Sequence, residues 1–220
     1  MTSRSARRWA APAALFVALA ALGAAVEQGT LRAIDRFGYA HLQPLHKGDW
    51  SHLADAASPA IACVLVAIAA VRLRSDARLA TAWLAALGLG AAIELICKPI
   101  VEHPYPRADE MPWLAHEGFP SGHAMRGVIV AGALSAAWPR ARGVLIAWAV
   151  ANAILVEVTR MHVPSEVIGG VLAGIALTTA VQAVRRPTDP RAPAGDPYGT
   201  AGARRPRTSA HGPSTDAMPG

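Results

Sequence analysis

Two histidines lie beside apolar segments together with other polar side chains. His123 ends the tetrapeptide Pro-Ser-Gly-His, and His162 is followed four residues later by Glu166. A carboxylate at this spacing can fix the tautomer of the imidazole ring and raise its basicity. The pair formed by His162 and Glu166 therefore predicts a nucleophile with an orienting acid, and His123 would be a second histidine that acts as an acid.

The residues around His123 also predict an anion-binding site. Ser121 is a good N-cap for a helix that begins at Gly122, because its side-chain oxygen can accept a hydrogen bond from the first helical turn. Gly122 has no side chain, so an anion can approach the free backbone N–H groups there. A helix N-terminus with free N–H groups and the positive end of the helix dipole favours an anion.

Lys98 lies at the start of the polar segment that leads to His123, and Arg160 lies two residues before His162. Both cations could stabilise an oxyanion. Together with the histidines and Glu166, they indicate phosphoryl transfer through a covalent intermediate. Two histidines and a glutamate could also bind a metal ion. The neighbouring cations would repel a divalent ion, so we expect neither a metal nor another cofactor.

The composition indicates the kind of protein that positions these residues. The chain has 220 residues, of which 53% are hydrophobic and 16% are charged. Soluble domains average roughly 25% charged residues, and the mean hydropathy here is +0.29. A soluble enzyme, a disordered protein and a disulfide scaffold are poor fits, and Cys63 and Cys97 lie inside apolar runs where we expect free thiols.

The apolar residues form six runs, which predict an all-α bundle of six transmembrane helices. The C-terminal end of the chain differs from these apolar runs, because no Leu, Ile, Val, Phe or Trp occurs in residues 185–220. We therefore divide the chain into a transmembrane domain, 1–184, and a disordered basic tail rich in Pro and Gly, 185–220. The predicted spans are approximately Trp9–Val26, Ala56–Val71, Leu79–Cys97, His123–Trp138, Val144–Val158 and Val167–Val184.

Lysine and arginine positions predict the orientation of the helices. With the N-terminus in the cytoplasm, 14 basic residues lie on the cytoplasmic side and six on the other side. Both termini are therefore expected in the cytoplasm, with 27–55, 98–122 and 159–166 as outward-facing loops. We expect the first span to be a retained signal anchor. The net charge of +6 is spread between apolar runs and so does not indicate a nucleic-acid partner.

The motifs resemble those of the type 2 phosphatidic acid phosphatase superfamily. The resemblance rests on Lys98, on Pro-Ser-Gly-His ending at His123, and on His162-x-Pro-Ser-Glu166. It covers roughly residues 79–184. It implies a membrane-bound, six-helix lipid phosphatase whose site lies between the third-to-fourth and fifth-to-sixth connections.

The resemblance also implies a role for each motif residue. His162 would be the nucleophile that forms a phosphohistidine, Glu166 would orient it, and His123 would protonate the leaving group. The phosphate oxygens would be bound by Lys98, Ser121 and the Gly122 backbone. No metal takes part in the family's mechanism.

The chain departs from the family pattern at three positions. Tyr105 stands where the first motif has an arginine, and Arg107 follows two residues later. Val156 stands where the third motif has an arginine, and Arg160 is the expected substitute. Glu166 replaces the usual aspartate, so the same carboxylate is carried on a longer side chain.

Two further charges lie near the motifs. Arg126, three residues after His123, either replaces the missing guanidinium or extends its side chain to the outer interface. Glu94 lies four residues before Lys98, in the favourable order for a helix ion pair, and is expected to hold Lys98 in position.

The sequence therefore predicts a lipid phosphatase in the cytoplasmic (inner) membrane, with its site facing the periplasm or exterior. Expected substrates are lipid phosphates such as undecaprenyl pyrophosphate, phosphatidic acid or phosphatidylglycerol phosphate. A lipid phosphotransferase and a non-catalytic lipid-phosphate-binding protein of the same fold are the alternatives. A small-solute transporter fits less well, because the polar residues gather at one end of the bundle. The sequence does not indicate an oligomeric state.

Overall fold

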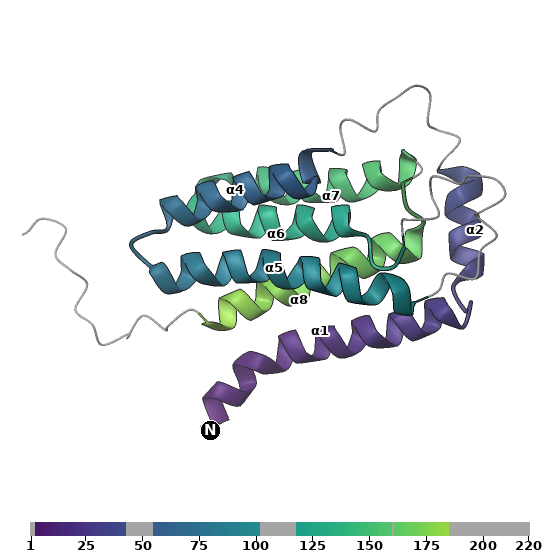
Figure 1. The fold of residues 1–220 in the computed structure, drawn as a ribbon, viewed down its shortest axis with the longest axis horizontal. Helices are drawn as coiled ribbons and strands as arrows, with labels where there is room; N and C mark the ends of the chain where they lie inside the picture. The colour runs from purple at the N-terminus through teal and green to yellow at the C-terminus, as the bar shows by residue number, and fades with distance from the viewer. Residues whose placement is uncertain (1–2, 43–54, 102–117, 160, 185–220) are drawn as a thin grey trace, which may run out of the picture. The chain divides into compact units, whose positions relative to one another are not determined.

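The computed structural model describes residues 3–42, 55–101, 118–159 and 161–184, which are helical apart from short connections and contain no strand. These residues belong to one compact unit, 1–186. Figure 1 shows the helices in chain order. They are α1 (Ser3–Glu27), α2 (Arg32–His41), α4 (Pro59–Arg72), α5 (Ala77–Ile100), α6 (Gly122–Ala137), α7 (Arg142–Val158) and α8 (Pro164–Val184), with the 3₁₀ turns η2 (Asp55–Ala57) and η4 (Pro139–Ala141).

Local signals explain where several helices begin. The Asp76 side chain accepts a hydrogen bond of 3.0 Å from the backbone N–H of Leu79 and so caps α5. Pro59 and Pro164 are the first residues of α4 and α8, a position where the missing N–H of proline costs nothing. Between α1 and α2, Gly29 has a φ of 71°, a conformation that glycine adopts without steric cost.

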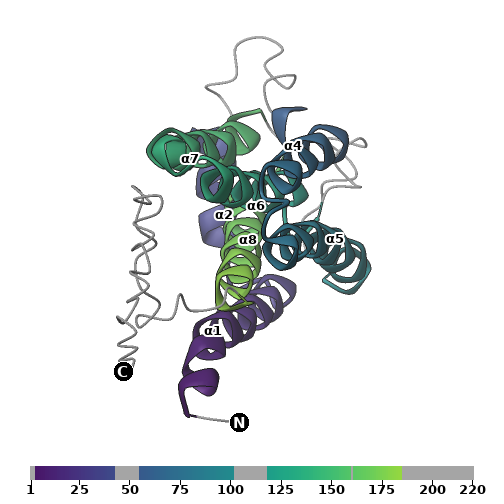
Figure 2. The ribbon, with the colours of Figure 1, turned by 90° about the vertical axis from the view of Figure 1, so that its left-hand side faces the viewer.

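Helix α6 lies at the centre of the bundle (Figure 2). Ten of its sixteen residues are buried, and it packs against α4, α5, α7 and α8. Its close approach to α8 depends on glycine, since a Cβ at Gly174 would come within 2.9 Å of the Met125 carbonyl oxygen. Small residues at helix contacts are typical of bundles in lipid. Helix α6 is therefore enclosed by four other helices, and this packing fixes the position of its first residues.

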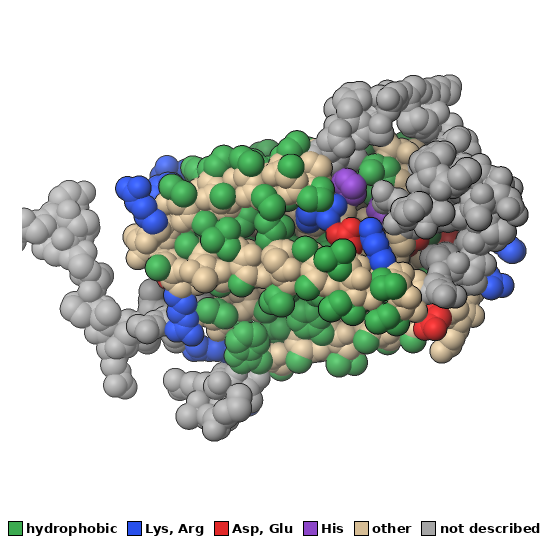
Figure 3. Space-filling view, viewed as in Figure 1, with side chains coloured by type: hydrophobic (Ala, Val, Ile, Leu, Met, Phe, Trp, Pro, Cys, Tyr) green, Lys and Arg blue, Asp and Glu red, His purple; other side chains and the backbone are tan. Residues whose placement is uncertain are grey.

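The outer surface of the bundle is apolar along the length of the helices (Figure 3). Leu95 and Val144 are each 75% exposed, and many other large aliphatic side chains are also exposed. In the described residues, four helices are long and apolar enough to cross a membrane, and α4 is a shorter apolar helix. A multi-pass membrane protein is the class that combines such spans with an apolar exterior.

Each predicted span coincides with a helix: α1, α4, α5, α6, α7 and α8. The count of six spans stays a prediction, because four helices of the described residues are long and apolar enough to cross a membrane. The cytoplasmic location of both termini also stays a prediction. Cys63 and Cys97 are free thiols, as expected. The tail, 185–220, lies outside the described residues.

The interpretation of 27–55 as a loop is wrong for its first part, because this segment contains α2. The helix has only ten residues, too few to cross a membrane. In Figure 1, α2 lies across one end of the bundle, close to the N-terminal end of α8. It alternates charged and apolar side chains, so a search for continuous apolar runs overlooked it.

Candidate active site

The His162 ring is held by Glu166 at the beginning of α8. Nδ1 of His162 lies 2.8 Å from Oε2 of Glu166, and both side chains are buried. The same carboxylate oxygen accepts a hydrogen bond of 3.4 Å from the backbone N–H of Val163. The two residues do not share a helix face as expected, because α8 begins at Pro164. Glu166 instead reaches back from the first helical turn toward the residues that precede it.

With Glu166 ionised, this contact determines which nitrogen of the His162 ring carries the proton. A carboxylate accepts hydrogen bonds and, when ionised, has no proton to donate. Nδ1 of His162 is therefore the nitrogen that carries the proton. In the neutral ring, Nε2 then holds the lone pair, on the side of the ring opposite Glu166.

His123 faces His162 from the first turn of α6. The ring centroids are 6.4 Å apart and the ring planes are inclined by 56°. Nδ2 of Asn152 in α7 donates a hydrogen bond of 3.2 Å to the backbone carbonyl oxygen of His123. Three helices therefore fix the relative positions of the two imidazole rings.

The two motifs are also joined through the backbone. The N–H of Ser121 donates to the carbonyl oxygen of Glu166 over 2.9 Å. The Ser121 side chain caps α6 as predicted, accepting from the N–H of Ala124 at 3.3 Å. A Cβ at Gly170 would collide with the Ser121 carbonyl oxygen, so α8 and the start of α6 are in close contact here. Ser121 thus connects the two histidine motifs, since its backbone bonds to Glu166 and its side chain caps α6.

Glu94 connects the cations of the site. Its Oε1 lies 2.8 Å from Nζ of Lys98, as the spacing predicted, and its Oε2 lies 2.5 Å from Nη1 of Arg126. Nε of Arg126 donates a further hydrogen bond of 2.9 Å to the carbonyl oxygen of Ala57. The Arg126 side chain is buried, so its guanidinium points into the bundle and not out to the interface.

The Glu94 carboxylate lies directly against Gly122. A Cβ at Gly122 would overlap all three atoms of that carboxyl group. The position where an anion was expected, at the start of α6, therefore borders a carboxylate supplied by the protein itself. Any phosphate that binds here must share Lys98 and Arg126 with Glu94.

Helix α2 supports the second motif from outside. Asp35 is 1% exposed, and its two carboxylate oxygens accept hydrogen bonds of 2.9 Å from the N–H and the hydroxyl of Ser165. A carboxylate at the N-terminus of a helix is favoured by free N–H groups and by the helix dipole. A Cβ at Gly38 would overlap Pro164, so α2 packs tightly on the start of α8.

The structure therefore places most of the predicted site residues in one region. Lys98, Ser121, Gly122, His123 and Arg126 lie at the adjoining ends of α5 and α6, and His162 and Glu166 at the start of α8. In Figure 3 the visible histidine and acidic side chains lie toward this end of the apolar exterior together with some basic ones, whereas other basic side chains lie at the opposite end. Arg107, Tyr105 and Arg160 lie outside the described residues. Within the described ranges, no three His, Cys, Asp or Glu side chains come together as metal ligands.

Sequence reasoning missed Asp35, Asn152 and the contact between Glu94 and Arg126. Asn152 had a recognisable signal, as a lone amide inside an otherwise apolar run. Asp35 had a weaker signal, as an acid in the first turn of a short amphipathic helix. The contacts of Asp35 and Arg126 join residues 130 and 32 positions apart, and no spacing rule predicts them.

The described residues form an all-helical bundle with apolar spans, in which two histidines face one another and one of them is hydrogen-bonded to a carboxylate. A family model described as the PAP2 superfamily matches residues 79–188. The chain belongs to this superfamily, whose members are typically phosphatases. Neither a curated protein nor a solved structure matches the chain.

Proposed function

We propose that this protein is an integral membrane lipid phosphatase that removes phosphate from lipid phosphate monoesters or pyrophosphates through a phosphohistidine on His162. The observation that carries the proposal is the buried hydrogen bond between Nδ1 of His162 and Glu166, with His123 facing the same ring. A structural ion pair would not require a second histidine at this position. In a phosphoryl transfer, the oxygen that leaves when the nucleophile attacks requires a proton donor close by.

In the first step, Nε2 of His162 attacks the phosphorus atom and the bond between phosphorus and the leaving oxygen breaks. Glu166 stabilises the positive charge that develops on the His162 ring. Protonated His123 donates its proton to the leaving oxygen, which departs as the lipid alcohol or the lipid monophosphate. The phosphoryl group is then bound to His162 and His123 is neutral.

In the second step, water attacks the phosphohistidine. His123 accepts a proton from the water as the P–N bond breaks, and inorganic phosphate is released. Both rings return to their starting protonation states, so the cycle consumes one water for each phosphate released. Such a two-step route splits one difficult hydrolysis into two easier reactions.

The cations and the start of α6 supply charge stabilisation in this proposal. Lys98 and the backbone of Gly122 would bind the phosphate oxygens, and Arg107, Arg126 or Arg160 would provide the guanidinium that the first and third motifs lack. Transition-state charge stabilisation by one such group is worth about 3 kcal/mol in other enzymes.

The expected substrates are lipid phosphates whose hydrocarbon chain stays in the bilayer. Lys98 belongs to the last turn of the apolar helix α5, which supports a site at the membrane interface. We infer that the site faces the periplasm or exterior of an inner membrane. Undecaprenyl pyrophosphate, phosphatidic acid and phosphatidylglycerol phosphate are the substrates to test first.

Phosphate release by the purified chain in detergent tests the proposal. A panel of these lipids is assayed with excess chelator, for wild type and for His162→Ala, His123→Ala and the matched surface control His41→Ala. We expect chelator-insensitive release that is lost in the first two variants and kept in the third. Binding of lipid phosphate with no release from any substrate would favour the non-catalytic alternative. Transfer of the phosphoryl group to an added alcohol in preference to water would favour the phosphotransferase.

A further inference from the structure

A groove of about 720 Å³ runs between α7 and α8, away from the histidines. Its floor is formed by small and apolar residues of α6, among them Val128 and Gly132, and its walls by Ile146 and Val150 of α7 and by Ile175 of α8. Both walls pack on α6 and only slightly on one another. A volume of a few hundred to about 1,000 Å³ is typical of a small-molecule or lipid site.

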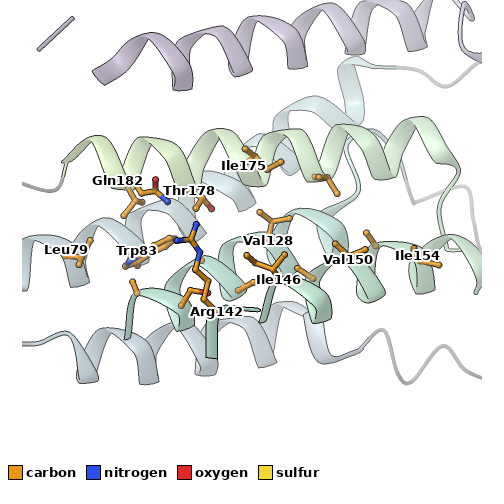
Figure 4. Close-up of a pocket in the computed structure, with 18 residues that line it drawn as sticks. Leu79, Trp83, Val128, Arg142, Ile146, Val150, Ile154, Ile175, Thr178 and Gln182 are labelled. Carbon is orange, nitrogen blue, oxygen red and sulfur yellow. The ribbon is translucent and has the colours of Figure 1, made fainter. Parts of the chain in front are cut away.

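The groove is apolar along its length and polar at one end. Its polar lining residues are Ser135, Arg142, Thr178 and Gln182, with the Trp83 indole beside them. All of them lie in the parts of α5, α6, α7 and α8 that are remote from His123 and His162. Figure 4 shows the Arg142 side chain extending from the beginning of α7 toward Thr178 and Gln182. The lining thus has the polarity of an amphiphile, with one charged end and a long apolar body.

The dimensions of the groove match a lipid of one leaflet. From Arg142 to Ile154 the wall formed by α7 spans 13 residues. The 12 steps between them at a rise of about 1.5 Å per residue give roughly 18 Å. Half of a bilayer hydrocarbon core is roughly 15 Å thick. An acyl chain that begins near Arg142 would therefore extend along the groove to about the middle of the bilayer.

The charge at the end of the groove indicates the kind of head group. In the described part of the chain, no carboxylate forms an ion pair with Arg142, and its side chain is exposed. Guanidinium groups bind phosphate oxygens in a bidentate manner. Basic pockets between transmembrane helices are common sites for anionic lipid head groups.

We propose that this groove is a binding site for an anionic phospholipid, with the phosphate on Arg142, Thr178 and Gln182 and one acyl chain between α7 and α8. The lipid is a structural ligand and not a substrate, because its head group lies at the opposite end of α7 and α8 from the histidines. The proposal does not depend on the phosphatase activity. The lipid would fill the space between two helices that pack little against one another.

Thermal unfolding of the purified full chain in uncharged detergent tests the site. Phosphatidylglycerol and phosphatidylcholine with identical acyl chains are titrated separately, and the shift in Tm reports binding to the folded protein. We expect phosphatidylglycerol to bind roughly tenfold more tightly. Arg142→Gln should remove this difference, and Arg140→Gln, which changes an exposed arginine outside the groove, should keep it. Equal shifts for both lipids in wild type, or an unchanged preference in Arg142→Gln, would overturn the proposal.

A second pair of variants tests whether the chain lies in the groove. Ala149 lines the groove and Ala151 does not. Ala149→Phe should abolish the stabilisation by phosphatidylglycerol, because the ring fills the middle of the groove, whereas Ala151→Phe should bind as wild type does. Normal binding by Ala149→Phe would show that the lipid sits elsewhere and would refute the assignment.

Discussion

The carboxylate of Glu94 lies between Lys98 and Arg126, 2.8 Å from Nζ of the first and 2.5 Å from Nη1 of the second. The same carboxylate lies against Gly122 at the beginning of α6. A phosphate at this helix terminus would need the same cations. Glu94 therefore neutralises the two cations that a phosphate at this helix terminus would contact.

Replacing Glu94 by Gln should strengthen phosphate binding. The amide keeps the shape of the side chain and removes the negative charge that competes for Lys98. We expect the inhibition constant of inorganic phosphate, measured in the phosphatase assay, to fall about tenfold, since a charge a few ångströms away changes an anion's affinity by one or more kcal/mol at a partly screened site. An unchanged or higher constant would mean that Glu94 serves to position Lys98 and does not compete with phosphate.

Glu94→Ala should instead destabilise the fold. It leaves the buried Arg126 guanidinium without any hydrogen-bond acceptor on α5, whereas the amide oxygen of Gln can still accept that hydrogen bond. Removing one partner of a buried ion pair costs about 3 kcal/mol or more. Thermal unfolding in detergent should show a lower Tm for Glu94→Ala than for Glu94→Gln. Equal Tm values would indicate that the pair with Arg126 contributes little to stability.

Gly122→Ala should reduce both stability and activity. A methyl group at this position overlaps the Glu94 carboxylate, so α5 or the start of α6 must move. Gly88→Ala is the matched control, because nothing lies within 4 Å of the added Cβ and alanine favours a helix by about 1 kcal/mol over glycine. We expect kcat to fall at least tenfold only in Gly122→Ala. Similar kinetics in the two variants would contradict the tight contact between Glu94 and Gly122.

The contact between Asp35 and Ser165 should affect turnover, although neither residue touches His162. Both hydrogen bonds are buried, and they hold the first turn of α8 that carries Glu166. Asp35→Ala, Ser165→Ala and the double variant form a double-mutant cycle. We expect a coupling free energy of about 1–2 kcal/mol, measured from kcat, with KM little changed. Additive effects would show that α2 does not position the motif.

The three arginines near the motifs should differ in effect. Arg126 is buried and bonded to Glu94 and Ala57, so Arg126→Ala should lower Tm as well as activity. If Arg107 or Arg160 supplies the missing guanidinium, its change to Ala should raise KM or lower kcat while leaving Tm unchanged. Measuring kcat, KM and Tm for each of the three variants separates these roles. If all three variants keep full activity, no arginine substitutes for those that the motifs lack at Tyr105 and Val156, and the idea is refuted.

Short-range contacts of the site were predictable from the sequence. The pairs Glu94–Lys98 and His162–Glu166 follow from a spacing of four residues, and the cap by Ser121 follows from its position before Gly122. The positions of the apolar helices were predictable for a similar reason, since a continuous apolar run is sufficient to indicate them.

Contacts between distant segments were not predictable. Arg126 meets Glu94 only because α5 and α6 pack side by side, and that packing depends on the shapes of many side chains. Helix α2 was overlooked because Ile34 and Phe37 alternate with Arg32, Asp35 and Arg36 in a segment too short to span a membrane. The groove beside Arg142 depends on α7 and α8 packing on α6 but only slightly on one another, which no local pattern describes.

The central claim is that His162 carries the phosphoryl group. Its most direct test is covalent labelling: the purified protein is mixed with a lipid phosphate that carries radioactive phosphorus, quenched rapidly in alkali, digested and mapped. We predict an acid-labile, alkali-stable label on the peptide that contains His162, absent in His162→Gln and present in His41→Gln. Phosphate release without any label at His162, or a label on His123 instead, would contradict the proposed mechanism.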